Sequence, residues 1–544
     1  MVQQFSFEFG YPKIKFHGIE FSVSVHTFEN TYTVDPADWT EKDISHKERE
    51  IAGTRLRFAG GQLSCNGIYK IRMRVKENGA VGISFQIKMD LPIRGTRLIV
   101  YEQPNGQIIS RIDASALPVP KTGVTLPYPE AWRCLATPFL AVQNEGGYSW
   151  YRSLDKAVNA KRFTLYGEDK LTVELSYDTL GIDVGSFCIT PEWEIGFAKE
   201  LAAVYQEHTR HVAKAYGLES WEIRKDVPDW LRKISLVVAL HGMHFTGYIF
   251  NTYSDMLEKL EWMAEQIDPA KVLVYLPGFE GRYYWEYGKY DASQRLGGAG
   301  QLKRLVARAK ELGFHIIPML GANIVNTKTE NFACFGDASR FVTTGGVFPT
   351  NMVDWDNSRS YDHGWMAYLN PAAPAWQNRL IDEAACLYHK FGFSGIYLDI
   401  SGMWLNDARY DVAEGTRTLV RRIRERCGDC LVIGEAWYDG IANVFPLVQN
   451  GHTDGVMHYY DEAIPGFFET YCRMFGHLCQ GDPGSNSTGV HELGYNSITS
   501  TPLRRAVIPT LTMVGDTLDK NMEGVKEIIK QAETYYKLYI AGNR

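Results

Sequence analysis

The sequence predicts two domains: an N-terminal antiparallel β-sandwich over residues 1–190 and a C-terminal (β/α)8 barrel of the TIM type over residues 231–544. Two observations predict this fold class. The chain has 544 residues, which is too long for one compact hydrophobic core. Its apolar residues also change period, from alternation in the first part to buried runs separated by amphipathic segments in the second. A linker helix and a connection are expected over residues 191–230.

Paired strands are predicted throughout the N-terminal part. Two alternating runs flank Asn78-Gly79, a strong hairpin signal; they contain Tyr69, Ile71, Met73 and Val75, then Ile83, Phe85, Ile87, Met89 and Leu91. Further strands are predicted over residues 97–102 and 171–177. A helix is predicted over residues 196–216, and the segment from Val227 to Trp230 marks the connection to the second domain.

Buried strands and amphipathic helices are predicted to alternate in the C-terminal part. The strands are the apolar runs at residues 234–240, 272–276, 315–320, 395–400 and 431–435, followed by 454–459 and 506–514. Helices are predicted between them, with Gly313, Gly392 and Gly428 at their C-terminal ends. A last helix is predicted over residues 522–539. This alternation favours a closed parallel barrel. A seventh strand near residues 489–498 is left open, so an incomplete barrel stays an alternative.

Composition excludes several classes of partner. The net charge is −7, so the chain lacks the basic surplus that nucleic-acid binding requires. No apolar run approaches the roughly 20 residues that cross a membrane. The first residues do not resemble a signal peptide, and the nine cysteines show no repeating spacing. We therefore expect a reduced, cytoplasmic protein, and the oligomeric state is not predicted.

Two carboxylates stand at the ends of neighbouring predicted strands, Asp399 and Glu435. In a parallel barrel the chemistry takes place at these ends. Because adjacent strands lie about 4.8 Å apart, the two carboxyl groups could approach to about 5–5.5 Å, as in retaining glycosidases. They would also push their pKa values apart, which keeps one of them protonated. As alternatives, each carboxylate caps a helix or pairs with Arg282 or Arg409, and rival candidates are Asp407, Asp439, Asp461 and Glu462.

Polar and aromatic residues near the other strand ends are predicted to bind a sugar. Aromatic residues make up 13% of the chain, and aromatic faces suit the C–H faces of sugar rings. The candidates are His241, His244, Arg282, Tyr283, Tyr284, Trp285, Tyr287, Asn323, Trp404, Trp437, His458 and Asp461. No ligand spacing indicates a metal site, and no cofactor is expected. The long connection over residues 321–370 is expected to form one side of the active site.

Two short motifs resemble those of known enzymes. Gly395-Ile396-Tyr397-Leu398-Asp399 and Ile433-Gly434-Glu435-Ala436 resemble the nucleophile and acid/base motifs of retaining α-glycosidases in the α-amylase superfamily. The order of sandwich and barrel resembles endo-α-N-acetylgalactosaminidases and the α-galactosidase group. The resemblance implies that Asp399 is the nucleophile and Glu435 the acid/base. The His-Asp pair of the seventh amylase strand has no counterpart here, so a third, stabilising carboxylate is unassigned.

The predicted function is therefore a glycoside hydrolase that cleaves an α-linked sugar by a retaining double displacement. Its partner would be an oligosaccharide or another glycoside. Three alternatives stay open: a transglycosylase with the same covalent intermediate, a non-catalytic carbohydrate-binding barrel, and a metal-dependent lyase or isomerase using His241, His244 and Glu280. The identity of the sugar, its linkage and endo or exo action are not predicted.

Overall fold

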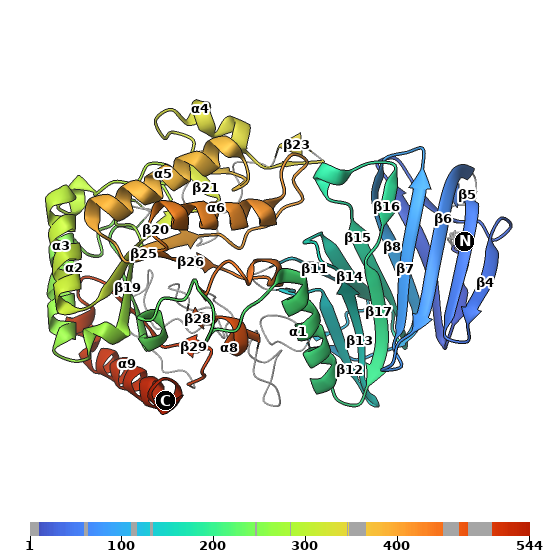
Figure 1. Ribbon diagram of the computed structural model, residues 1–544, viewed down its shortest axis with the longest axis horizontal. Helices are drawn as coiled ribbons and strands as arrows, with labels where there is room; N and C mark the ends of the chain where they lie inside the picture. Colours follow the sequence, from blue (N-terminus) through green and yellow to red (C-terminus); the bar gives the residue numbers. More distant parts are fainter. Residues whose placement is uncertain are drawn as a thin grey trace, which may run out of the picture. The chain divides into compact units, whose positions relative to one another are not determined.

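The chain forms two compact units, Met1–Tyr216 and Gly217–Arg544 (Figure 1). The computed structural model describes residues 10–58, 64–109, 117–130, 134–244, 247–282, 284–344, 346–347, 366–449, 467–476 and 503–543. Within these residues, no helix is both long and apolar enough to cross a membrane.

The first unit is a ladder of antiparallel strands. Its strands are β1 (Ile14–Phe16), β2 (Ile19–Thr27), β3 (Thr31–Val34), β4 (Thr40–Ser45), β5 (Glu48–Phe58), β6 (Ser64–Val75), β7 (Val81–Met89), β8 (Ile93–Pro104), β9 (Gln107–Ile108), β10 (Leu117–Pro118), β11 (Val124–Tyr128), β12 (Phe139–Asn144), β13 (Gly147–Leu154), β14 (Lys161–Tyr166), β15 (Lys170–Asp178), β16 (Phe187–Ile189) and β17 (Glu192–Ala198). The predicted hairpin is confirmed, since β6 and β7 pair from Gly67↔Met89 to Val75↔Val81.

The ladder folds back on itself to enclose one core. Pairing runs from β11 through β14, β15, β8, β2, β3, β5, β6 and β7 to β17, β13 and β12. Phe163 of β14 and Trp193 of β17 are distant along this ladder, yet their rings meet edge to face at 5.7 Å between centroids. The two halves of the ladder therefore face each other as the layers of a sandwich.

The predicted helix over residues 196–216 is wrong at its start. Residues 192–198 form β17, which pairs with β13 and β7, and helix α1 spans only Ala202–Tyr216. The alternation of Trp193 and Ile195 with polar neighbours has the period of a strand. A side chain at Gly196 would collide with the ring of Trp150, which lies 2.3 Å from the position of a Cβ atom.

The second unit contains a ring of parallel strands. They are β18 (Leu236–Leu240), β19 (Val272–Leu276), β20 (His315–Gly321), β25 (Gly395–Asp399), β26 (Leu431–Glu435), β27 (Leu447–Gln449), β28 (Arg473–Phe475), β29 (Val507–Ile508) and β30 (Thr510–Met513). Only Pro509, which lacks an N–H group, separates β29 from β30. Because β29 pairs with β28 and β30 pairs with β18, the two together act as the eighth strand and close the barrel.

Most of the predicted helices are present, but the alternation of strand and helix is incomplete. The long helices are α2 (Tyr253–Ala264), α3 (Gly298–Leu312), α5 (Pro374–Phe391), α6 (Val412–Arg426) and α9 (Thr517–Tyr539), and α8 (Phe467–Tyr471) is short. Gly313 and Gly392 end their helices in the left-handed conformation, as predicted. Between β26 and β27 the chain forms only a 3-10 turn, Asp439–Ile441, so this connection departs from a regular (β/α)8 barrel.

The later strands were predicted less well than the first five. The sequence does not predict β27 and β28, and the strands predicted over residues 454–459 and 489–498 lie outside the described residues. The long connection after β20 contains β21 (Ile324–Asn326), α4 (Phe332–Phe335) and β24 (Met366–Tyr368), and β21 pairs with β24.

Candidate active site

Asp399 and Glu435 are the last residues of the neighbouring strands β25 and β26. The two strands pair in parallel up to Leu398 and Gly434, so the carboxylates that follow lie side by side. Both side chains are buried, with 3% of Asp399 and 2% of Glu435 exposed. The sequence places both groups at the C-terminal end of the barrel, where the chemistry of such barrels takes place.

Each carboxylate is followed by a residue with left-handed backbone. The φ angle is +58° at Ile400 and +58° at Ala436. This conformation is unfavourable for residues with a Cβ atom, above all for a β-branched isoleucine. Strain of this kind concentrates at functional sites, where the surrounding structure holds it in place. Here the turn directs the Ile400 N–H group to Glu435, and it donates to Oε2 at 2.7 Å.

A hydrogen-bond donor is directed at each carboxyl group. The Tyr287 hydroxyl donates to Asp399 Oδ2 at 2.6 Å, as Ile400 N–H does to Glu435. Burial raises the pKa of Glu435, and the hydrogen bonds from Asp399 and from Ile400 N–H offset this only in part.

The predicted separation of about 5–5.5 Å between the two carboxyl groups stays a prediction. Paired strands lie about 4.8 Å apart, and the ends of β25 and β26 are in register. The side chains of Asp399 and Glu435 therefore start from neighbouring positions at the same end of the barrel.

Packed side chains fill the barrel beneath the carboxylate pair. The Tyr397 hydroxyl donates to Gln449 Oε1, and Gln449 Nε2 donates to the Tyr275 hydroxyl at 3.0 Å. Tyr275 lies 5.5 Å from Tyr397 and 5.5 Å from Phe475 between ring centroids. The barrel interior beneath the site is therefore filled by packed side chains, which fix the strand ends, as in other parallel barrels.

Glu280 is a third buried carboxyl group close to the pair. It lies in the loop after β19, its side chain is only 7% exposed, and burial raises its pKa well above the usual range. The negative charges of Glu286 and Asp399 raise this pKa further. Within the described part of the chain, neither carboxyl oxygen has a hydrogen-bond partner in another residue. In the sequence, Glu280 is indicated only as a metal ligand of the alternative lyase or isomerase.

The aromatic segment after β19 is largely packed inside the protein. Tyr284 and Tyr287 are 5% and 0% exposed, and their rings meet at 5.2 Å. The guanidinium of Arg282 covers the ring of Trp285 at 4.3 Å from its centroid. Of this segment, Tyr287 touches a catalytic candidate, and Tyr283 lies outside the described residues.

The predicted histidines pack around an aromatic ring. His241 and His244 are buried, their rings are 6.3 Å apart, and each lies beside Phe250. Among the residues that the structure describes, no group of three or more His, Cys, Asp or Glu side chains could hold a metal ion. The expectation of a metal-free enzyme stays a prediction.

The remaining candidates fall into three groups. Asn323 is buried beyond the end of β20, and its Oδ1 has no partner among the described residues. Trp437 is fully buried beside Glu435 in the chain, whereas Trp404 is half-buried in the loop after β25. His458 and Asp461, like the rival candidate Glu462, lie outside the described residues.

The rival carboxylates Asp407 and Asp439 are also buried. Asp407 accepts hydrogen bonds from the backbone N–H groups of Val342 at 2.8 Å and Arg409 at 2.7 Å. These bonds tie two loops together, which is a structural role. Asp439 belongs to the 3-10 turn after β26.

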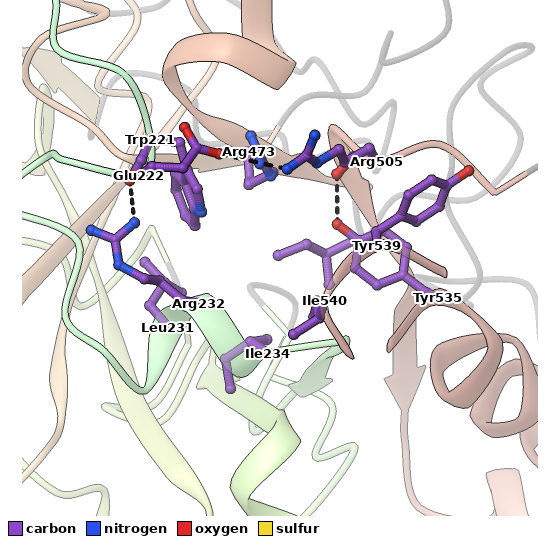
Figure 2. Close-up of a pocket in the computed structure, with 11 residues that line it drawn as sticks. Trp221, Glu222, Leu231, Arg232, Ile234, Arg473, Arg505, Tyr535, Tyr539 and Ile540 are labelled. Carbon is purple, nitrogen blue, oxygen red and sulfur yellow. Dashed lines mark hydrogen bonds and ion pairs between the residues drawn. The ribbon is translucent and has the colours of Figure 1, made fainter. Parts of the chain in front are cut away.

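A cavity of about 210 Å³ lies at the opposite end of the barrel (Figure 2). Ile234, just before β18, and Arg473, the first residue of β28, help to line it. Arg505 pairs with Glu222 at 3.6 Å and accepts a hydrogen bond on its backbone oxygen from the Tyr535 hydroxyl at 2.6 Å. This cavity lies at the N-terminal ends of the strands, where barrel residues stabilise the fold rather than catalyse.

Comparison with solved structures reveals the same architecture in known glycosidases. The α-N-acetylgalactosaminidase NagBb from Bifidobacterium bifidum is 10% identical, with a TM-score of 0.63 over 97% of this chain and 94% of its own. The galactosidase domain of the α-galactosidase-sucrose kinase AgaSK is 13% identical, with a TM-score of 0.53 over 96% and 73%. The GH36 α-galactosidase AgaA from Geobacillus stearothermophilus is 11% identical, with a TM-score of 0.51 over 95% and 73%.

The likeness is one of fold. No protein-family model matches the chain, and no curated protein matches it in sequence. The predicted order of a β domain followed by a barrel is the order found in these three glycosidases. At such low identity, the fold carries no information on substrate or on individual residues.

Proposed function

We propose that the protein is a glycoside hydrolase that cleaves α-linked sugars with retention of configuration. The observation that carries the proposal is the pair of buried carboxyl groups, Asp399 and Glu435, on strained turns at the C-terminal ends of adjacent barrel strands. The shared fold with three α-glycosidases supports it. An α-galactoside and an α-N-acetylgalactosaminide are the first substrates to test, because AgaA has been solved with raffinose and NagBb with GalNAc.

In the proposed reaction, Asp399 attacks the anomeric carbon while Glu435 protonates the departing oxygen. The raised pKa of Glu435 suits it to hold that proton. Tyr287 holds the attacking oxygen of Asp399 in place through its hydroxyl. Glu435 then takes a proton from water, which attacks the covalent glycosyl-enzyme and releases the sugar. For this reaction the two carboxyl groups have to lie about 5–5.5 Å apart when the sugar is bound.

A transglycosylase would use the same residues and the same covalent intermediate. It differs in the acceptor that attacks the intermediate, which is a sugar hydroxyl instead of water. Product analysis with and without an added sugar acceptor distinguishes the two activities.

The roles of the two carboxylates can be tested separately. Asp399→Ala should abolish turnover, because no covalent intermediate can form. Glu435→Ala should still cleave aryl α-glycosides with good leaving groups, and azide should restore its turnover with a glycosyl azide of retained configuration. In the wild type, a 2-deoxy-2-fluoro glycosyl fluoride should label the peptide that carries Asp399, as read by mass spectrometry. An azide product of inverted configuration from Glu435→Ala would exchange the roles, and a label on another residue would refute Asp399 as nucleophile.

A further inference from the structure

We propose that Glu280 is a sugar-binding residue whose carboxyl group takes up hydroxyl groups of a neutral glycoside in the same site as Asp399. The inference rests on the proposed function and adds a residue that defines the substrate. Glu280 stands out because it is buried and yet has no hydrogen-bond partner in another described residue. Buried polar groups nearly always have partners, and the exceptions concentrate at functional sites.

The loop that carries Glu280 is held rigidly against its neighbours. Gly278 has a φ of +65°, and a Cβ atom there would lie 2.3 Å from the backbone oxygen of Met243. Met243 N–H donates to Gly278 O at 3.0 Å, and the Tyr253 hydroxyl donates to Phe279 O at 2.6 Å. The inward direction of Glu280 is therefore built into the backbone.

In the part of the chain that the structure describes, the surroundings of Glu280 offer it no counter-charge. It forms no ion pair with any Lys, Arg or His of the described residues, and the charges that act on it, those of Glu286 and Asp399, are negative. The hydroxyl groups of Tyr253, Tyr287 and Tyr290 lie close enough that a negative charge on Glu280 would raise their pKa values. A buried carboxyl in such surroundings stays protonated, so it offers one donor and one or more acceptors.

This chemistry matches a sugar hydroxyl, which both donates and accepts hydrogen bonds. Asn323, beyond the next strand of the ring, adds a buried acceptor, Oδ1, that also lacks a partner among the described residues. An anionic sugar such as a uronic acid would bring its charge close to the Asp399 carboxylate, and no cation among the described residues pairs with Glu280 to balance it. The site therefore favours a neutral sugar ring.

The first experiment compares variants of two glutamates in the same loop. Glu280→Ala removes the proposed contact, and Glu286→Gln changes an exposed neighbour as a matched control. With aryl α-galactoside and aryl α-N-acetylgalactosaminide as probes, Glu280→Ala should lower kcat/KM about 100-fold or more, because a site built for a hydroxyl loses its partner. Glu286→Gln should stay within about twofold of wild type, as expected for a surface change. Equal effects of Glu280→Ala and Glu286→Gln would overturn the proposal.

A second experiment identifies the hydroxyl and excludes a merely structural effect. Monodeoxy versions of the better aryl glycoside are compared with the parent in wild type and Glu280→Ala. At one hydroxyl position of the sugar, removal of both the hydroxyl and the Glu280 side chain should lower kcat/KM no further than removal of either one alone. If the two fold-losses in kcat/KM multiply at every hydroxyl position, Glu280 does not bind a hydroxyl.

A third measurement separates failure of this inference from failure of the proposed function. Thermal shifts with free galactose and N-acetylgalactosamine require binding but no turnover. If no glycoside is hydrolysed but these sugars stabilise the wild type and not Glu280→Ala, the proposed function fails and the binding role stands. Equal stabilisation of both proteins, or of neither, overturns the binding role.

Discussion

Tyr287 connects the loop after β19 to the proposed nucleophile. Its hydroxyl donates to Asp399 Oδ2 at 2.6 Å from a fully buried ring. A hydrogen bond to a charged group contributes about 1.5–3 kcal/mol. Tyr287→Phe should therefore lower kcat by about 10- to 100-fold, with a smaller change in KM, when measured on an aryl α-glycoside.

Tyr290 in the same loop provides the control for this prediction. Its hydroxyl accepts from Gly321 N–H at 2.8 Å and donates to Gly321 O at 3.3 Å, so it supports the backbone rather than Asp399. Tyr290→Phe should lower the melting temperature more than it lowers kcat. Equal losses of kcat in the two variants would show that Tyr287 acts only through packing.

The buried carboxyl of Glu280 predicts a pH dependence of stability. Its pKa is raised well above the usual value by burial, so it keeps its proton in the folded state. Above about pH 4.3, the unfolded state binds fewer protons than the folded state, and the free energy of unfolding falls as pH rises toward the folded pKa. The Glu280→Gln variant has no titratable group at this position. Its melting temperature relative to wild type should therefore increase from about pH 5 to pH 8, as followed by thermal denaturation, and a constant difference would contradict the raised pKa.

Two glycines test the rigidity of the β19 loop as an element. Gly278 and Gly428 have similar positive φ angles, +65° and +62°, but only at Gly278 would a Cβ atom meet another residue. Gly428→Ala should cost about 1–2 kcal/mol, the strain of a left-handed residue. Gly278→Ala should cost more and should also lower activity, because the loop must move and carries Glu280 with it. Urea denaturation and kcat/KM measure the two effects, and equal losses in both variants would refute a rigid loop.

The elements that the sequence predicts well are those with a sustained apolar pattern. The five-residue strands β18, β19, β25 and β26 are apolar throughout or nearly so, and helices with clear periodicity separate them. β27 and β28 have three residues each, too few to show a pattern of their own. The division of the last strand into β29 and β30 at Pro509 likewise follows only from their pairing with β28 and β18, which the sequence does not show.

The site was predictable in its location and not in its contacts. Asp399 and Glu435 follow from the rule that chemistry gathers at strand ends. The hydrogen bonds that Tyr287 and Ile400 donate to them depend on register and rotamers, which the sequence pattern does not contain. Glu280 lies beyond its strand, and its inward direction depends on the positive φ of Gly278. The feature of the sequence that indicates this tight loop is the pair of glycines, Gly278 and Gly281, on either side of Phe279-Glu280.

At the scale of the whole molecule, the barrel depends on its last strand. β30 pairs with β18 and β29 with β28, so a chain that stops after Arg505 leaves two strand edges open. Open edges pair with other chains and cause aggregation. We expect such a truncated protein to be insoluble or to elute as aggregates in gel filtration. Removal of residues 541–544 is the control and should leave a soluble protein, and a monomeric, folded protein from the longer truncation would contradict the prediction.

Closure of the ring by its first and last strands also affects how the protein is made. On the ribosome, β18 emerges before any other barrel strand, and the partner that completes it emerges last. The sandwich unit precedes the barrel and can fold while translation continues, since domains generally fold as units from the N-terminus. Until β30 has been synthesised, one edge of β18 has no strand with which to form backbone hydrogen bonds. Nascent chains of this protein should therefore need chaperone protection late in synthesis, after the N-terminal unit has already reached its final form.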